Sequence, residues 1–257
     1  MLQSFKVAGI TFYPYSLFLI AGAVVCFLMF YFLTFKRHTD CFDENLFAMQ
    51  ALVISMGIAV PSSMLADSLF KFLESGIFKL GGATFYGGLL AAISVYSILL
   101  CIKKNRKITV YERLSDLSVC IPAGHSLGRV GCFFGGCCFG KPTDCVFGVI
   151  FPEDSIPYNY YGKLIAVHPT QLYEAFLLIA IFIFLVICGK NNSFPLYLIL
   201  YGTARIFIEF FRNDFRGSVG LPLSPAQLIS ILLILTGATV ISFKYNKAVG
   251  TDKNFLK

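Results

Sequence analysis

The sequence has no tryptophan, only three histidines, and few charged residues, which make up 14% of its 257 residues. Soluble domains carry about a quarter charged residues, so this chain has too little polar surface for a water-facing fold. The scarcity of charge also excludes a disordered chain and argues against a nucleic-acid-binding protein. Apolar residues make up 57% of the chain and the mean hydropathy is +0.75. These values predict a membrane protein.

Long uncharged runs show how the apolar residues are organised, since a helix needs about 20 mostly apolar residues to cross a bilayer. Four runs contain no Asp, Glu, Lys or Arg: 7–35, 45–66, 80–102 and 217–243. The first is longer than the hydrophobic core of a cleavable signal peptide, so we expect it to stay in the membrane.

Two further spans are predicted at 171–188 and 194–211, where charged residues lie within the span or at its edge. A weaker candidate covers 114–134, which is broken by Pro122 and several glycines and is tolerable only facing protein or a cavity. The expected fold is therefore an all-α membrane protein of about seven transmembrane helices in one domain, residues 1–257.

The positions of the basic residues predict the orientation of these spans. Twelve Lys and Arg follow the odd-numbered spans, seven lie on the other side, and two lie within spans. Positive residues favour the cytoplasm, so the amino terminus is predicted outside and the carboxyl terminus inside. The segment 135–169 then forms an extracytoplasmic loop between helices four and five. The net charge of +7 fits anionic lipid headgroups better than nucleic acid.

Ionisable residues inside membrane spans are costly and are candidates for function. Arg205 and Glu209 lie four residues apart, on one face of the predicted helix, and Tyr201 extends that face by a turn. A structural ion pair that needs no ligand is the alternative explanation.

Three other polar clusters fall at the predicted outer ends of spans. They are GHSLGRVGCFFGGCCFGKP at 124–142, AVHPTQLYEAF at 166–176 and GGATFYGGLLAAI at 81–93. Arg129 among exposed backbone amides suits a phosphate, although the glycines could equally serve close helix packing. Because all four clusters map to the outer side, a site for an anionic lipid headgroup is indicated there.

Five cysteines gather near the same outer region: Cys120, Cys132, Cys137, Cys138 and Cys145. On an oxidising face, one or two disulfides are the ordinary expectation. Packed thiols are an alternative, and so is zinc, although the C-x4-C-C spacing matches no standard structural zinc pattern.

Together the clusters resemble the prolipoprotein diacylglyceryl transferases. HPTQLYE at 168–174 is similar to the family's H-P-[ST]-Q-L-Y-E, and GRVGCFFGGCCFG at 128–140 to its G-R-x-G-N-F-x-N-G-E-x-x-G signature. ARIFIEFFR at 204–212, TFYGGLL at 84–90 and SPAQLIS at 224–230 resemble three further family elements.

The resemblance implies that a diacylglyceryl group moves from phosphatidylglycerol to the thiol of a prolipoprotein lipobox cysteine. Glycerol phosphate would leave, at a site on the outer face of the bacterial inner membrane, without cofactor or metal. Arg129 and Arg205 would bind the lipid phosphate. Further substrate-binding candidates are Glu209, Tyr201, Tyr13, Gly140, Gln171 and Tyr173.

The sequence also departs from the family pattern. Tyr86 stands where the pattern has His, and a phenol with an ordinary pKa near about 10 is a poor base at neutral pH. Cys132, Gly135 and Cys137 replace two Asn and a Glu. We expect His125 or His168 to act as the base instead, with His125 favoured. Alternatives are a related transferase with another acceptor, a thiol oxidoreductase using the outer cysteines, and a non-catalytic lipid-binding or transport protein.

Overall fold

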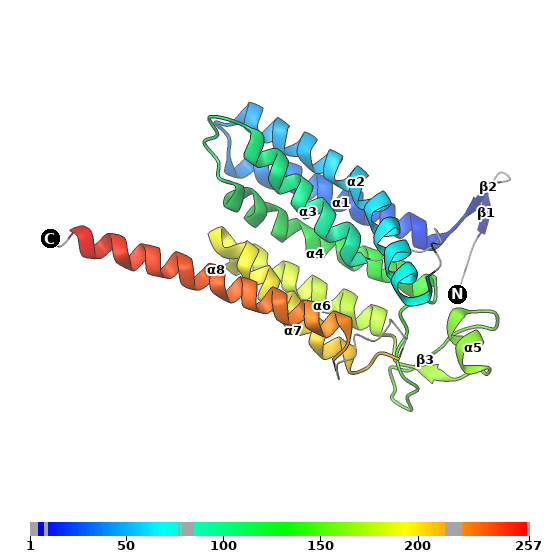
Figure 1. Cartoon of the computed structure of the whole chain (residues 1–257). Coiled ribbons are helices and arrows are strands. Elements are labelled where there is room, and N and C mark those ends of the chain that lie inside the picture. The colour runs from blue at the N-terminus through cyan, green and yellow to red at the C-terminus, as the bar shows by residue number, and fades with distance from the viewer. Residues whose placement is uncertain (1–4, 8–9, 77, 79–84, 214–222, 256–257) are drawn as a thin grey trace. The chain divides into compact units, whose positions relative to one another are not determined.

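Figure 1 shows the computed structural model of the chain, which describes residues 5–7, 10–76, 78, 85–213 and 223–255. The chain divides into two compact units. One consists of Met1–Leu28 with Ser115–Lys257, and the other of Met29–Leu114. The unit of Met1–Leu28 and Ser115–Lys257 is called the large unit below, and Met29–Leu114 the small unit.

Helices dominate the described residues, as the composition predicts. They are α1 (Pro14–Arg37), α2 (Phe42–Ser75), α3 (Phe85–Ile102), α4 (Val110–Phe134), α5 (Ile156–Tyr161), α6 (Thr170–Phe184), α7 (Ser193–Glu209) and α8 (Pro225–Phe255). A π-helical turn, Leu185–Gly189, and a 3-10 turn, Lys190–Asn192, join α6 to α7.

Two short antiparallel hairpins complete the described secondary structure. β1 (Phe5–Val7) pairs with β2 (Ile10–Phe12), with Phe5 opposite Phe12. β3 (Val149–Ile150) pairs with β4 (Ala166–Val167), with Val149 opposite Val167.

Four described helical segments are long and apolar enough to cross a membrane: Pro14–Arg37, Phe42–Leu69, Thr170–Gly189 and Pro225–Asn246. Gly87–Ile102 in α3 is apolar but shorter. Many of their large apolar side chains are exposed, such as Ile20 in α1 and Leu232 in α8, each about three-fifths exposed. Lipid is the solvent that accommodates such side chains, so the structure is that of an all-α multi-pass membrane protein.

The observed helices differ from the predicted spans mainly at their ends. The first span was predicted from residue 7, but α1 begins at Pro14 because β2 and Tyr13 precede it. The weaker 114–134 candidate is one continuous helix, α4, which passes through Pro122. The last helix extends beyond residue 243, to Phe255. The predicted starts at 80–84 and 217–222 lie outside the described residues.

In the small unit, α2 and α3 lie side by side (Figure 1). The buried Arg113 donates through Nη2 to Asn45 Oδ1 at 2.7 Å, and Asn45 Nδ2 donates to the His38 carbonyl at 2.8 Å. The Glu44 carboxylate accepts from the backbone N–H groups of Lys107 and Ile108. These bonds attach the connection between α3 and α4 to the start of α2.

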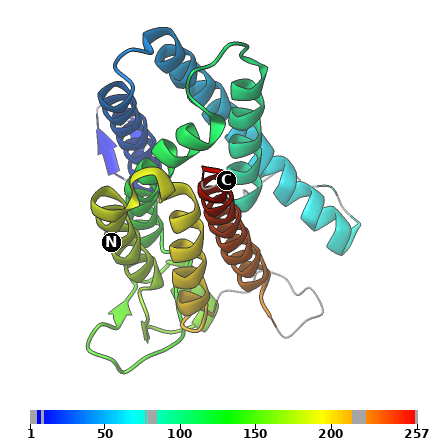
Figure 2. The same ribbon diagram turned by 90° about the vertical axis from the view of Figure 1, so that its left-hand side faces the viewer.

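In the large unit, α7 packs against both α6 and α8, as the two views in Figures 1 and 2 show. A capping box begins α8: Gln227 N donates to Ser224 Oγ at 3.2 Å, and Ser224 N donates to Gln227 Oε1 at 3.0 Å.

The first part of α1 meets α4 at a pair of facing glycines. A Cβ built on Gly22 would overlap the Gly124 carbonyl oxygen, and one on Gly124 would overlap the Gly22 carbonyl and approach Cys26 Cβ to 2.9 Å. The backbones therefore touch, which is a common way for membrane helices to pack.

We predict that Gly124→Ala destabilises the protein by about 1–3 kcal/mol, because the added methyl group must push two backbones apart. The measurement is the free energy of unfolding in detergent micelles. Gly128→Ala, in the same helix, is the matched control, because a Cβ there meets no described atom within 4 Å. The control should be neutral or stabilising by up to about 1 kcal/mol. Equal destabilisation by both variants would contradict the close contact.

Candidate active site

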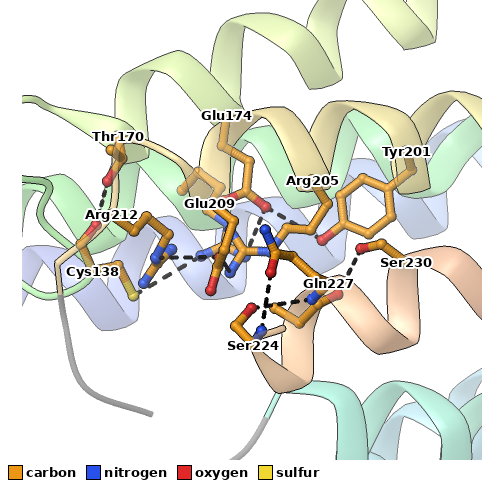
Figure 3. Close-up of polar contacts among 12 residues, drawn as sticks. Cys138, Thr170, Glu174, Tyr201, Arg205, Glu209, Arg212, Ser224, Gln227 and Ser230 are labelled. Atoms are coloured by element: carbon orange, nitrogen blue, oxygen red, sulfur yellow. Dashed lines mark hydrogen bonds and ion pairs between the residues drawn. The ribbon is translucent and has the colours of Figure 1, made fainter. Parts of the chain in front are cut away.

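Glu174, in the second turn of α6, is at the centre of a buried charge cluster in the large unit. Its Oε1 lies 2.9 Å from Arg129 Nη2 of α4. Its Oε2 lies 3.2 Å from Arg205 Nη1 of α7, and Figure 3 shows Glu174 and Arg205 together. Only 1% of Glu174, 1% of Arg205 and 7% of Arg129 is exposed. Two arginines from different helices thus share one carboxylate, with one guanidinium on each oxygen.

The polar face predicted for α7 is confirmed. Arg205 Nη2 lies 3.0 Å from Glu209 Oε2, one turn further along the helix. Tyr201 OH, one turn earlier, donates to Glu174 Oε1 at 3.3 Å. Arg212 Nε lies 4.0 Å from Glu209 Oε2. The ion pair predicted from the spacing therefore exists, but it is part of a larger network that includes α4 and α6.

The part of this network that the structure describes contains three arginines, Arg129, Arg205 and Arg212, and two glutamates, Glu174 and Glu209. Charge is poorly solvated where these side chains are buried, so electrostatic interactions there are strong. Guanidinium groups suit the oxygens of a phosphate.

The first turn of α6 fixes the chain that follows α4. Thr170 Oγ1 donates to the Cys138 carbonyl at 2.6 Å, and Gln171 Nε2 donates to the Cys137 carbonyl at 2.6 Å. Gln171 is buried, and its Oε1 has no hydrogen-bond partner among the described residues. A buried acceptor of this kind is costly unless a ligand donates to it.

Gly140 joins three segments of the site through its backbone. Its N–H donates to the His168 carbonyl at 2.9 Å, its carbonyl accepts from Tyr161 OH, and it forms a bridge with Arg212. A Cβ there would lie 2.6 Å from the Phe211 carbonyl oxygen and 2.7 Å from His168 Cβ. Only glycine allows this close approach, so Gly140 positions the loop against the ends of α6 and α7.

The two candidate histidines have different surroundings. Arg129 Nε donates to His125 Nε2 at 3.2 Å, and the His125 ring lies edge-on to that of Tyr201. His168, just before α6, has its Nδ1 3.2 Å from Tyr173 OH and its ring against Phe211. His125 therefore belongs to the arginine network, whereas His168 and Tyr173 form a separate pair.

Tyr13 and Tyr86 are the remaining predicted site residues. Tyr13 precedes α1, and its side chain is 58% exposed. Tyr86 is in α3, in the small unit, and its side chain lies outside the described part of the chain.

Glu174 and Arg212 were not among the site residues predicted from the sequence. Glu174 could have been found as the only acidic residue of the predicted span 171–188, within the HPTQLYE motif. Arg212 lies three residues after Glu209, a spacing that places both on one helical face.

All nine cysteines are thiols, so the disulfides expected for the outer cysteines are not formed in this structure. The sulfur atoms of Cys132, Cys137 and Cys138 all lie within 4.8 Å of one another. Hydrogen bonds with Cys132 and Cys138, together with burial, raise the pKa of the Cys137 thiol. Arg129 Nη1 contacts Cys138 Sγ at 4.0 Å.

Comparison with known proteins identifies the family of the chain. The family model of prolipoprotein diacylglyceryl transferase matches residues 3–243. A phosphatidylglycerol–prolipoprotein diacylglyceryl transferase 2 of Clostridium perfringens is 32% identical over 258 residues, covering 95% of each chain. The corresponding transferase of Wolbachia pipientis from Culex pipiens is 30% identical, covering 94% of this chain and 95% of its own. The Clostridium tetani transferase is 38% identical over 168 residues, covering 63% of this chain and 64% of its own. The chain belongs to the prolipoprotein diacylglyceryl transferase family.

Proposed function

We propose that this transferase moves a diacylglyceryl group from phosphatidylglycerol to the thiol of a lipobox cysteine in a prolipoprotein, releasing glycerol phosphate. Family membership makes the chain a transferase of lipoprotein biosynthesis. The observation that carries the assignment of the site is the pair of buried arginines, Arg129 and Arg205, which are held together by the Glu174 carboxylate.

The chemistry needs such a cluster at the phosphate. The acceptor thiolate attacks the glycerol carbon that carries the phosphate ester, a C–S bond forms, and the C–O bond breaks. The electrons of that bond go to the departing phosphate, which gains a second negative charge. Guanidinium groups in a water-poor site stabilise this developing charge more strongly than the single charge of the bound lipid.

Glu174 contributes by fixing the two arginines before the lipid arrives. Each carboxylate oxygen holds one guanidinium, and Tyr201 holds one of these oxygens in turn. Because the pair is already in place, it needs little rearrangement during the reaction. Preorganisation of this kind is the main source of electrostatic catalysis. We assign Glu209 and Arg212 to the same network, and the unpartnered Gln171 Oε1 to a glycerol hydroxyl group of the headgroup.

The proposed topology has seven spans, α1 to α4 and α6 to α8, with the amino terminus outside and the carboxyl terminus in the cytoplasm. The distribution of Lys and Arg among the loops supports it. The charge cluster then faces the outer side of the bacterial inner membrane, and the chain acts as one domain. Tyr13 and Tyr173 would contact the lipid near the interface, where tyrosines are enriched. Tyr86 stays a candidate from the family pattern.

The base that ionises the acceptor thiol is proposed to be His168 rather than the initially favoured His125. The positive guanidinium of Arg129 is hydrogen-bonded to the His125 ring and opposes the second positive charge that a base would acquire there. In His168, only Nδ1 has a hydrogen-bond partner in the described structure, and the other ring nitrogen is available for a proton. His125 then supports Arg129.

Replacing either phosphate-binding arginine by lysine should lower the transfer rate by about 100-fold, because lysine cannot supply the paired donors of guanidinium. The assay follows label from phosphatidylglycerol to a lipobox peptide by mass spectrometry, for Arg129→Lys and Arg205→Lys. Arg37→Lys, at the exposed end of α1, is the matched control and should keep the full rate. Full activity in both site variants would show that the two guanidinium groups are not required for the reaction.

Glu174→Gln should destabilise the protein by about 3–5 kcal/mol, because two buried guanidinium groups lose their shared counter-charge. Glu209→Gln should cost less, since the Glu209 side chain is 12% exposed against 2% for Glu174. Unfolding in detergent micelles measures both. Equal losses would mean that Glu174 is not the central residue of the network.

The histidine assignment predicts a pH-dependent defect. His168→Ala should slow transfer by about 100-fold at pH 7. The defect should shrink as the pH approaches the ordinary thiol pKa of about 8.5, because the acceptor then ionises without a base. His125→Ala should give a loss that does not vary with pH, since it removes a partner of Arg129. If neither variant slows transfer, a histidine base is wrong.

A further inference from the structure

The lipid-transfer mechanism leaves one cluster of thiol side chains unused. Cys132 lies in the last turn of α4, and Cys137 and Cys138 lie in the segment that follows. Their three sulfur atoms are within 4.8 Å of one another, and all three residues are half-buried. Three half-buried thiols this close together can act as ligands of one metal ion, and they are more than a patch of small apolar side chains.

The surrounding structure fixes the backbone that carries these sulfurs. The Cys137 and Cys138 carbonyls are held by Gln171 and Thr170 of α6, each at 2.6 Å. Cys138 has a φ of 62°, in the left-handed region that residues other than glycine rarely adopt. A conformation of this kind persists only where neighbouring contacts hold it, and such residues cluster at functional sites.

The spacing suits a metal ion better than a disulfide. Zinc binds sulfur at about 2.3 Å, so two sulfurs on one tetrahedral zinc lie about 3.8 Å apart. The three sulfurs lie within 4.8 Å of one another, which is close to that separation. A disulfide needs a bond of about 2.05 Å and can join only two of the three. Thiolates are soft ligands, which select zinc-like cations over magnesium or calcium.

The nearby charge is also suitable. Arg129 Nη1 lies 4.0 Å from Cys138 Sγ, so a guanidinium faces the sulfur that would carry negative charge. A positive group at this distance favours the thiolate form of the sulfur, which is the form that binds a metal. The same contact connects the sulfur group to the arginine network.

We propose that Cys132, Cys137 and Cys138 bind a thiophilic divalent cation of the zinc class through three thiolate sulfurs. The described residues supply three ligand atoms there, so a fourth coordination position takes an exogenous ligand such as water or a thiol. The proposal does not depend on the identity of the lipid donor or of the acceptor.

Cobalt(II) is the probe, added to the reduced, full-length protein in detergent micelles. Binding should give the thiolate-to-cobalt charge-transfer absorption at one ion per chain, and zinc should displace it. Cys132→Ser, Cys137→Ser and Cys138→Ser should each weaken binding by about 100-fold. Cys145→Ser, an exposed cysteine of the same loop, is the matched control and should bind as the unaltered protein does. The proposal would be overturned if the unaltered protein gave no charge-transfer absorption. It would also be overturned if Cys145→Ser weakened cobalt binding as much as the other three variants do.

A second measurement uses only the unaltered chain, in case the serine variants do not fold. Zinc should protect Cys132, Cys137 and Cys138 from maleimide, as read by peptide mass mapping, while Cys145 stays reactive. Equal labelling with and without zinc would contradict the metal site. Because neither measurement involves lipid transfer, a failure here is distinct from a failure of the proposed transferase substrates.

Discussion

The sharing of the Glu174 carboxylate between two arginines is the constraint on which the large unit depends. Each of the three groups would be very costly to bury alone, and they are tolerated only together. Because Arg129, Glu174 and Arg205 come from α4, α6 and α7, the network fixes how these helices are rotated and how far each extends. The polar face of α7 follows from this, since Tyr201 and Glu209 must lie one turn on either side of Arg205.

The segment between α4 and α6 is tied to the same constraint. Gly140 bonds to His168, and Lys141 N–H donates to the Phe211 carbonyl at 2.8 Å, so the loop is attached near the ends of α6 and α7. Phe139, Phe151 and Val167, which all belong to this segment, form a small apolar core that stabilises it. The charged residues thus lie beside a loop whose backbone is held by hydrogen bonds and by an apolar core, as a preorganised site needs.

The sequence predicted the helices well because hydrocarbon allows few charges, and uncharged runs therefore mark the spans directly. It also predicted the Arg205–Glu209 pair, because helical periodicity fixes neighbours within one helix. It could not predict that Glu174 holds both arginines, because contacts between helices depend on tertiary packing. The continuity of α4 through Pro122 was missed for a similar reason. The low helix propensity of proline is a local property, whereas the groups that compensate for its lost hydrogen bond come from neighbouring helices. The start of α1 was missed because β2 is as uncharged as the helix that follows it.

The cysteines bear on how the headgroup would be recognised. At positions where the resembled family pattern has Asn and Glu, Cys132 and Cys137 offer weak hydrogen-bonding groups. On the proposed function, fewer neutral donors and acceptors would surround the phosphate, so its binding would depend more on the guanidinium groups of the arginine network. Charge distinguishes an anionic lipid from a zwitterionic one but discriminates little among anionic headgroups of similar size. On the proposed function, discrimination among anionic headgroups therefore rests on the few fixed polar atoms that remain, of which the buried Gln171 Oε1 is the clearest.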